Sequence, residues 1–407
     1  MLKRIAVKQL AVGMFVDGFD RAWLSHPFWR TRFAIKDEAR LKEVQASGIS
    51  HCWIDVSKGA DLQADTALEE TATAAILEEL APPRPQRVAL AEELERARRL
   101  RARSAEAMRQ MFTEARLGNA IEPNACAPLV NDVVESINRH PDALLSLLRL
   151  KTADEYTYIH SVAVCALMVA LARQLGFSEA RCHEAGTAGL LHDLGKAAMP
   201  LEILNKPGKL THQEFAIIRQ HPVRGFEMLC DSGAASEAVM DVCRHHHERA
   251  DGKGYPDGLT LERNSQLAKM GAVCDVYDAI TSDRPYKAGW DPAHALSQMA
   301  AWEGHFDTQV FQSFVKCLGI YPIGSLVRLR SGRLAVVLEQ NAAALTRPRI
   351  KVFFSTKAGL PLEPHVIDLA SPHATDLIES REPPEKWKFS YLMELWEAGA
   401  AFKHARG

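Results

Sequence analysis

The chain has 407 residues, 47% hydrophobic and 25% charged, which is ordinary for a globular protein of two or three domains. Its formal net charge is -2, which gives no support to binding of polymeric nucleic acid and requires any recognition of phosphate to be local. Eight scattered cysteines without a Cys-x-x-Cys pair indicate reduced core thiols and a cytoplasmic location. The longest apolar run, residues 162–172, is too short to span a membrane.

The first predicted unit, residues 1–62, is a small α+β domain without a catalytic cluster. Apolar segments at 5–7, 14–16 and 52–56 predict strands, and residues 38–44 predict a helix. Residues 63–120, rich in Ala, Glu and Arg, predict a helical connector. Prolines within residues 82–85 divide it, and the second connector helix should cover about residues 88–116. We expect this connector to be an amphipathic or dimerisation helix with a solvated arginine-rich face.

Residues 121–318 have a persistent helical pattern and form the predicted all-α catalytic domain. The expected helices are at residues 131–138, 142–150, 156–175, 179–191, 213–220, 235–247 and 267–281. The last predicted unit, residues 319–407, is a β-rich C-terminal extension with strands at 325–329, 334–338 and 350–354 and a helix after residue 385. The predicted fold class is therefore mainly α, with strand-containing modules on either side of a helical domain.

Imidazole and carboxylate side chains recur along the predicted catalytic domain. The candidate ligands are His160, His192, Asp193, His221, His246, His247 and Asp275. Such ligands without thiolate favour Fe, Mn or Zn over a structural Cys-type zinc site. Seven groups exceed the needs of one ion, so we expect two divalent ions bridged by Asp193, a type of site suited to attack on phosphorus. Lys196, about one helical turn after Asp193, is expected to stabilise charge on phosphoryl oxygens.

Each of these residues also has an ordinary structural interpretation. Taken alone, His160 would be a core histidine, His221 before Pro222 could end a helix, and Asp275 would be a buried acid in need of a partner. The joint occurrence of all seven favours the metal site. The glycine-containing segment 248–256 could likewise be a surface turn. Its position directly after His246-His247 predicts instead that it shapes the metal pocket.

Together these motifs resemble the HD-GYP subgroup of the HD phosphohydrolase superfamily. The resemblance covers residues 121–318, about half of the chain, and residues 1–62 resemble the small domain of unknown function that often precedes HD-GYP domains. The matching motifs are His192-Asp193-Leu194-Gly195-Lys196, the segments 206–211 and 283–287, His221-Pro222, His246-His247-Glu248 and Gly254-Tyr255-Pro256.

The resemblance implies a bacterial phosphodiesterase that opens cyclic di-GMP to pGpG and, in some members, continues to GMP. It implies that the seven candidate ligands hold two metal ions, usually iron or manganese, that Lys196 contacts the scissile phosphate, and that Arg284 and Lys287 bind the substrate. Some members hold a third metal through a glutamate four residues before the first histidine. That position is Tyr156 here, and Glu155 is out of phase, so we expect two metals and pGpG as the main product.

Two other functions are compatible with the same motifs. The first is a receptor that binds a cyclic dinucleotide with negligible turnover and signals through a protein partner, such as a GGDEF-domain protein. The second is a hydrolase of another cyclic dinucleotide or of a nucleotide monophosphate. A homodimer is a further candidate assembly.

Overall fold

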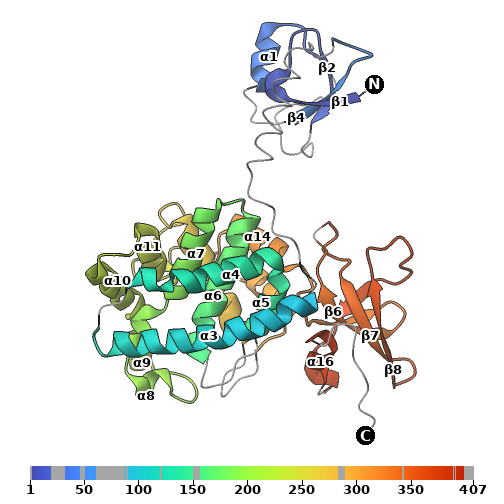
Figure 1. Ribbon diagram of the computed structural model, residues 1–407. Helices are drawn as coiled ribbons and strands as arrows, with labels where there is room; N and C mark the ends of the chain where they lie inside the picture. Colours follow the sequence, from blue (N-terminus) through green and yellow to red (C-terminus); the bar gives the residue numbers. More distant parts are fainter. Residues whose placement is uncertain are drawn as a thin grey trace. The chain divides into compact units, whose positions relative to one another are not determined.

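The computed structural model describes residues 2–19, 33–45, 51–60, 88, 90–119, 122–149, 156–282, 289–341, 343–387, 389 and 391–397. The chain divides into two compact units, Met1–Arg84 and Pro85–Gly407. Figure 1 shows both units. Outside the described residues lie the first predicted connector helix, Glu155 and both predicted substrate-binding residues, Arg284 and Lys287.

The described residues of the first unit form a small antiparallel sheet and one α-helix. Its strand order is β1-β4-β2-β3. Strand β4 shows why the sheet forms, because Cys52 and Ile54 are buried while Trp53 between them is 40% exposed. The elements are β1 (Leu2–Ala6), η1 (Val7–Gln9), β2 (Phe15–Phe19), β3 (Phe33–Ala34), α1 (Glu38–Gln45) and β4 (His51–Asp55).

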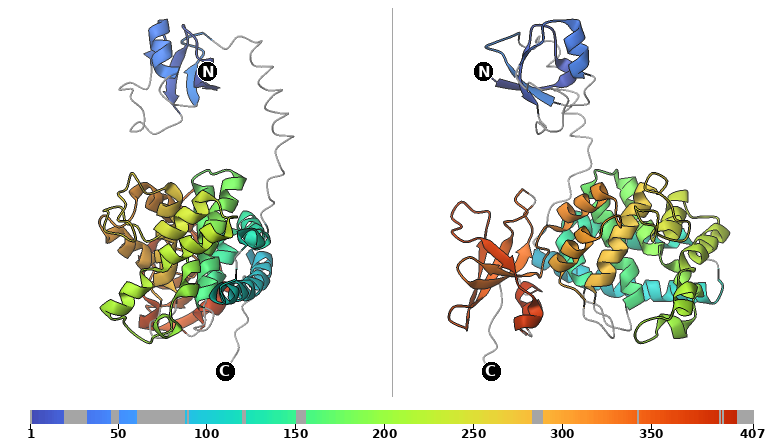
Figure 2. Two further views of the ribbon diagram at one scale, coloured as in Figure 1. Left: turned by 90° about the vertical axis from the view of Figure 1, so that its left-hand side faces the viewer. Right: turned by 180° about the vertical axis from the view of Figure 1, so that it is seen from behind.

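The second unit begins with a body of helices, drawn from cyan to orange in Figures 1 and 2. Helix α6 lies at its centre and packs against α3, α4, α5, α7, α12 and α14. The helices are α3 (Leu90–Arg116), α4 (Ala127–Arg139), α5 (Pro141–Leu148), α6 (Tyr156–Gln174), α7 (Glu179–Leu191), α8 (Leu201–Leu204), α9 (His212–Ile218), α10 (His221–Ser232), α11 (Glu237–His245), α12 (Gln266–Thr281), α13 (Pro292–Ala301) and α14 (Thr308–Leu318). Two 3-10 turns, η3 (Pro123–Cys126) and η5 (Leu194–Ala198), lie between them.

Helix α6 is the one described helix that is long and apolar enough to cross a membrane. Of its window Thr157–Gln174, 78% is buried by the rest of the fold, as is usual for the core helix of a globular protein. Its apolar character therefore has a sufficient explanation in packing.

The chain continues into an antiparallel sheet of order β8-β7-β6-β5-β9. Residues on one sheet face, such as Leu334 and Val336, belong to the same buried cluster as the helices. The alternating residues Ala335 and Val337 fill a separate cluster on the other face. The elements are β5 (Leu326–Leu329), β6 (Arg333–Glu339), β7 (Arg349–Ser355), β8 (Leu360–Asp368), β9 (Ile378–Arg381), α15 (Pro384–Trp387) and α16 (Leu392–Glu397).

The predicted fold class is confirmed: a mainly helical chain carries strand-rich regions at both ends. One helix was not predicted: residues 221–232 form α10, which His221 begins, so the alternative in which His221 ends a helix does not apply. Pro222 lies in the first turn of α10, where its missing N–H would have no partner within the helix in any case.

Candidate metal centre

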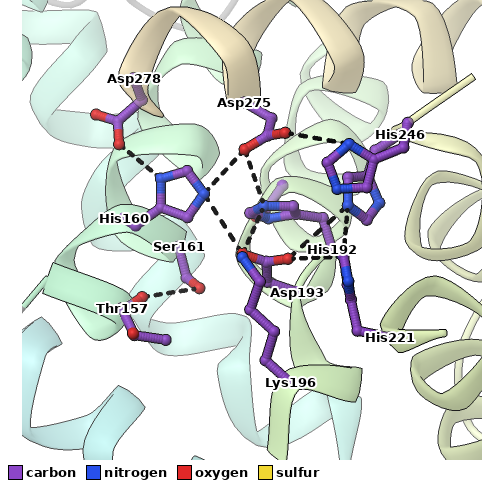
Figure 3. Close-up of polar contacts among 12 residues, drawn as sticks. Thr157, His160, Ser161, His192, Asp193, Lys196, His221, His246, Asp275 and Asp278 are labelled. Carbon is purple, nitrogen blue, oxygen red and sulfur yellow. Dashed lines mark hydrogen bonds and ion pairs between the residues drawn. The ribbon is translucent and has the colours of Figure 1, made fainter. Parts of the chain in front are cut away.

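The structure brings all seven predicted ligands into one cluster inside the helical body. Three overlapping groups within it each have their ligand atoms within 4.8 Å of one another. Figure 3 shows Asp193 and Asp275 pointing between the imidazoles. The contributing elements are α6 for His160, the end of α7 for His192 and Asp193, the first turn of α10 for His221, the end of α11 for His246 and His247, and α12 for Asp275.

The first group of donors joins α6, α7 and α12. His160 Nε2 lies 3.0 Å from Asp275 Oδ1, and His192 Nε2 lies 3.8 Å from the same oxygen. Both imidazoles also face Asp193 Oδ2, at 3.4 Å from His160 and 3.3 Å from His192. These four side chains surround one small volume with nitrogen and carboxylate oxygen.

The second group joins α10 to the end of α11. His221 Nε2 lies 3.3 Å from His246 Nε2 and 3.2 Å from Asp193 Oδ1. His246 Nε2 lies 3.8 Å from that same oxygen, and the ring of His247 is 4.2 Å from the ring of His246, centre to centre. The two carboxylate oxygens of Asp193 therefore face different donor groups, which is the geometry of a bridging ligand.

Hydrogen bonds on the outer side of three rings fix which nitrogen faces the cluster. The Nδ1 atoms of His192 and His221 each lie 2.7 Å from a backbone carbonyl oxygen, of Gly189 and Ile218 respectively. The Nδ1 atom of His246 lies 3.0 Å from the Cys243 carbonyl oxygen. A carbonyl oxygen only accepts, so we assign Nδ1–H to all three rings and leave each Nε2 with an inward lone pair.

This assignment leaves the Nε2 atoms of His192, His221 and His246 as acceptors that face the acceptor oxygens of Asp193. His192 Nε2 and Asp193 Oδ1 are buried and have no hydrogen-bond donor among the described residues. The 3.2 Å approach of His221 Nε2 to Asp193 Oδ1 then places one lone pair against another. Uncompensated buried acceptors are costly, and a divalent cation between them removes that cost. The residues present therefore fit bound metal.

Asp278 is a residue beside the candidate metal ligands that the sequence motifs did not identify. Its Oδ2 lies 2.6 Å from His160 Nδ1, the pairing that typically orients a metal-ligating histidine. Burial disfavours charge on His160, but contacts with Asp193, Asp275 and Asp278 outweigh it and raise its pKa to about 10. The signal was present in the sequence, because Asp278 follows Asp275 by one helical turn on α12.

Lys196 lies on η5 beside the cluster, where its Nζ is 2.5 Å from Asp193 Oδ2. Arg116, the last residue of α3, donates hydrogen bonds to the carbonyl oxygens of Met199 at 3.0 Å and Lys196 at 3.3 Å. A Cβ on Gly195 would overlap backbone atoms of α10. Glycine at this position therefore lets the Lys196 turn contact the helix that begins with His221.

The loop after His247 is tied down by one buried carboxylate. Glu248 Oε1 accepts hydrogen bonds from the backbone N–H groups of Asp257 at 2.7 Å and Gly258 at 3.0 Å, and its Oε2 accepts one from Leu259 at 3.0 Å. Within this loop, the ring of Tyr255 stacks on His247 with centres 4.7 Å apart. The loop therefore covers the His247 side of the cluster.

Two family models match the chain: a domain of unknown function, DUF3391, over residues 2–126 and an HD domain over residues 125–310. The chain is 55% identical over 399 residues to cyclic di-GMP phosphodiesterase PA4108 of Pseudomonas aeruginosa, covering 97% of this chain and 96% of the relative. It is 38% identical over 181 residues to the cyclic di-GMP phosphodiesterase response regulator RpfG of Xanthomonas campestris, covering 42% of this chain and 47% of the relative. Among solved structures, Bd1817, an HDG"Y"P protein from Bdellovibrio bacteriovorus, is 19% identical with a TM-score of 0.47, covering 77% of this chain and 98% of that chain.

Proposed function

Because this chain belongs to the HD-GYP cyclic di-GMP phosphodiesterases that carry an N-terminal DUF3391 domain, we propose that its metal centre hydrolyses a phosphodiester bond of cyclic di-GMP. The chain is a hydrolase of bacterial second-messenger signalling. The observation that supports this proposal at the level of residues is the cluster of seven imidazole and carboxylate side chains inside the HD domain, in which the buried His192 Nε2 and Asp193 Oδ1 have no hydrogen-bond donor among the described residues.

We further propose two divalent ions, iron or manganese. His160, His192 and Asp275 would hold one, His221, His246 and His247 the other, and Asp193 would lie between them. Ions bound in this way supply Lewis-acid polarisation of the phosphate and activation of water. Carboxylate and neutral imidazole suit both metals. Burial raises the pKa values of Asp193 and Asp275, but their histidine contacts, with Lys196 beside Asp193, outweigh it and keep both carboxyls ionised.

The remaining catalytic work falls to side chains around the cluster. Lys196 places an ammonium group where charge develops on the phosphoryl oxygens during hydrolysis. We propose that Arg284 and Lys287 bind the substrate, and that pGpG is the main product because Tyr156 stands where a third-metal glutamate would be needed. The Glu248-anchored loop holds Tyr255 against His247 and so limits access of water to that side.

Location, assembly and domain division complete the proposal. The eight cysteines are all free and seven of them are at least half-buried, which fits a cytoplasmic location. We propose a homodimer, with a signalling partner such as a GGDEF-domain protein. We also propose a functional division of the chain into residues 1–62, 63–120, 121–318 and 319–407.

The test is anaerobic purification with metal analysis, followed by chromatography of the products formed from cyclic di-GMP and from a second cyclic dinucleotide. We expect about two metals per chain and pGpG as product, with both lost in Asp193→Asn. The matched control is Asp231→Asn, which changes an exposed aspartate on α10 and should behave as wild type. Full metal occupancy without product would favour the receptor function, preferred turnover of the second dinucleotide would reassign the substrate, and a chain that binds no metal would refute the mechanism.

A further inference from the structure

Three side chains form a stack that leads from the metal cluster to the protein surface. The rings of His247 and Tyr255 are stacked at 26° to one another, with centres 4.7 Å apart. The guanidinium carbon of Arg219 lies over the Tyr255 ring, 4.6 Å from its centre. Since His247 already occupies one face of the tyrosine, the guanidinium covers the other face. Arg219 is thereby placed one ring beyond a candidate metal ligand.

The guanidinium of Arg219 contacts a second aromatic ring. Its carbon lies over Phe215, one helical turn earlier, at 5.9 Å from the ring centre. Stacking uses the faces of the guanidinium plane, while its five N–H groups point outward within that plane. The aromatic contacts therefore orient Arg219 without consuming its hydrogen-bond donors.

Arg219 differs in this respect from other arginines near the site. Arg224, Arg244 and Arg249 each pair with a carboxylate, Arg224 with Glu227 at 2.9 Å and the other two with an aspartate at 2.7 Å. Within the described part of the chain, no carboxylate pairs with Arg219. An exposed, oriented guanidinium with unused donors is suited to bidentate binding of a phosphate.

The substrate of the proposed function carries a phosphate that the metal centre does not use. A cyclic dinucleotide has two phosphodiester groups in one ring, and only one can occupy the metal centre at a time. We propose that Arg219 binds the second phosphate, the one that is not being cleaved, and so favours cyclic dinucleotides over simple phosphodiesters. This inference rests on the proposed function and adds a substrate-binding residue to it.

The experiment compares two main substrates in three variants. They are cyclic di-GMP and bis(p-nitrophenyl) phosphate, which has a single phosphate, and cyclic di-AMP is added as a cyclic dinucleotide with a different base. Arg219→Gln should raise KM for cyclic di-GMP about tenfold or more, with kcat and metal content near the wild-type values, while the loss on the single-phosphate probe stays far smaller. Arg219→Lys should retain part of the affinity, because lysine keeps the positive charge. It should not retain all of it, because lysine lacks the planar pair of donors that binds a phosphate through two hydrogen bonds. The matched control, Arg224→Gln, should leave both substrates unaffected.

Three kinetic results would overturn the inference, and a binding measurement replaces them where the protein does not hydrolyse cyclic di-GMP. An unchanged KM for cyclic di-GMP in Arg219→Gln excludes a contact between Arg219 and the second phosphate. An equal loss of kcat/KM on both substrates shows that Arg219 only positions Tyr255. A loss on cyclic di-GMP that is absent with cyclic di-AMP assigns Arg219 to the guanine base instead of the phosphate. Failure of the proposed function is distinguishable, since wild-type protein would then not hydrolyse cyclic di-GMP. In that case, equal equilibrium affinities of wild type and Arg219→Gln for cyclic di-GMP would overturn the inference.

Discussion

The buried carboxylate of Glu248 should decide whether the Tyr255 loop stays against the metal centre. The side chain is 2% exposed and accepts three backbone hydrogen bonds from the loop. Glu248→Gln keeps the shape but removes the charge and turns one acceptor into a donor, so at least one backbone N–H of the loop faces the side-chain NH2 group of the glutamine. Loss of a hydrogen bond to a charged group costs about 1.5–3 kcal/mol. At 1.4 kcal/mol for each factor of ten, the undocked loop becomes roughly ten- to a hundredfold more populated.

The assay is hydrogen exchange of the backbone amides at residues 252–259, together with steady-state kinetics on cyclic di-GMP. We expect faster exchange confined to the loop and a KM raised by up to the same factor, with metal content unchanged. Glu262→Gln is the matched control, because Glu262 is an exposed glutamate shortly after the loop. Wild-type exchange at residues 257–259 in Glu248→Gln would refute the reasoning, since those amides would then be held by other contacts.

Three further changes test how the centre is supported. Asp278→Asn removes the carboxylate behind His160 and should weaken metal affinity about 10- to 100-fold, measured by competition with a chelator; wild-type affinity would contradict its orienting role. Gly195→Ala forces η5 away from α10 and should lower kcat about a hundredfold, whereas Gly18→Ala, where a Cβ meets nothing within 4 Å, should not. Arg116→Gln removes the hydrogen bonds to the carbonyl oxygens of Lys196 and Met199 and should lower kcat about tenfold at unchanged metal content. A kcat equal to that of the wild type would show that η5 keeps its position without Arg116.

Most of the helical body could be predicted because its helices are long and strongly patterned. The predicted range 179–191 coincides with α7, whose start is capped by the Ser178 side chain. Strand β8 was missed because two prolines and largely exposed side chains leave no apolar alternation to detect. Helix α10 was not predicted, because a proline such as Pro222 can follow the end of one helix or lie in the first turn of another, and only the surrounding packing decides between them.

The candidate metal ligands were easier to predict from the sequence than the residues that hold them in place. The seven proposed ligands were identified because histidine and aspartate are conspicuous at apolar helix positions, and the structure places them together. The groups that hold them act largely through backbone atoms, such as the Gly189 carbonyl behind His192 and the amides around Glu248. Backbone contacts between segments far apart in sequence have no residue-type signature. Arg116, about 80 residues before the turn that it holds, shows the same limit for a side chain.

The two-faced sheet after α14 has a consequence for how this protein can be divided. Leu326, Leu334, Val336 and Phe353 lie in the same apolar cluster as the helices, and each such side chain stabilises the fold by about 1.5–3 kcal/mol when fully buried. A chain cut after residue 318 would expose to water the apolar helical surface that these side chains cover. The catalytic helices and the terminal sheet are therefore expected to melt in a single transition. A change in the sheet would then alter hydrolysis without touching a single ligand.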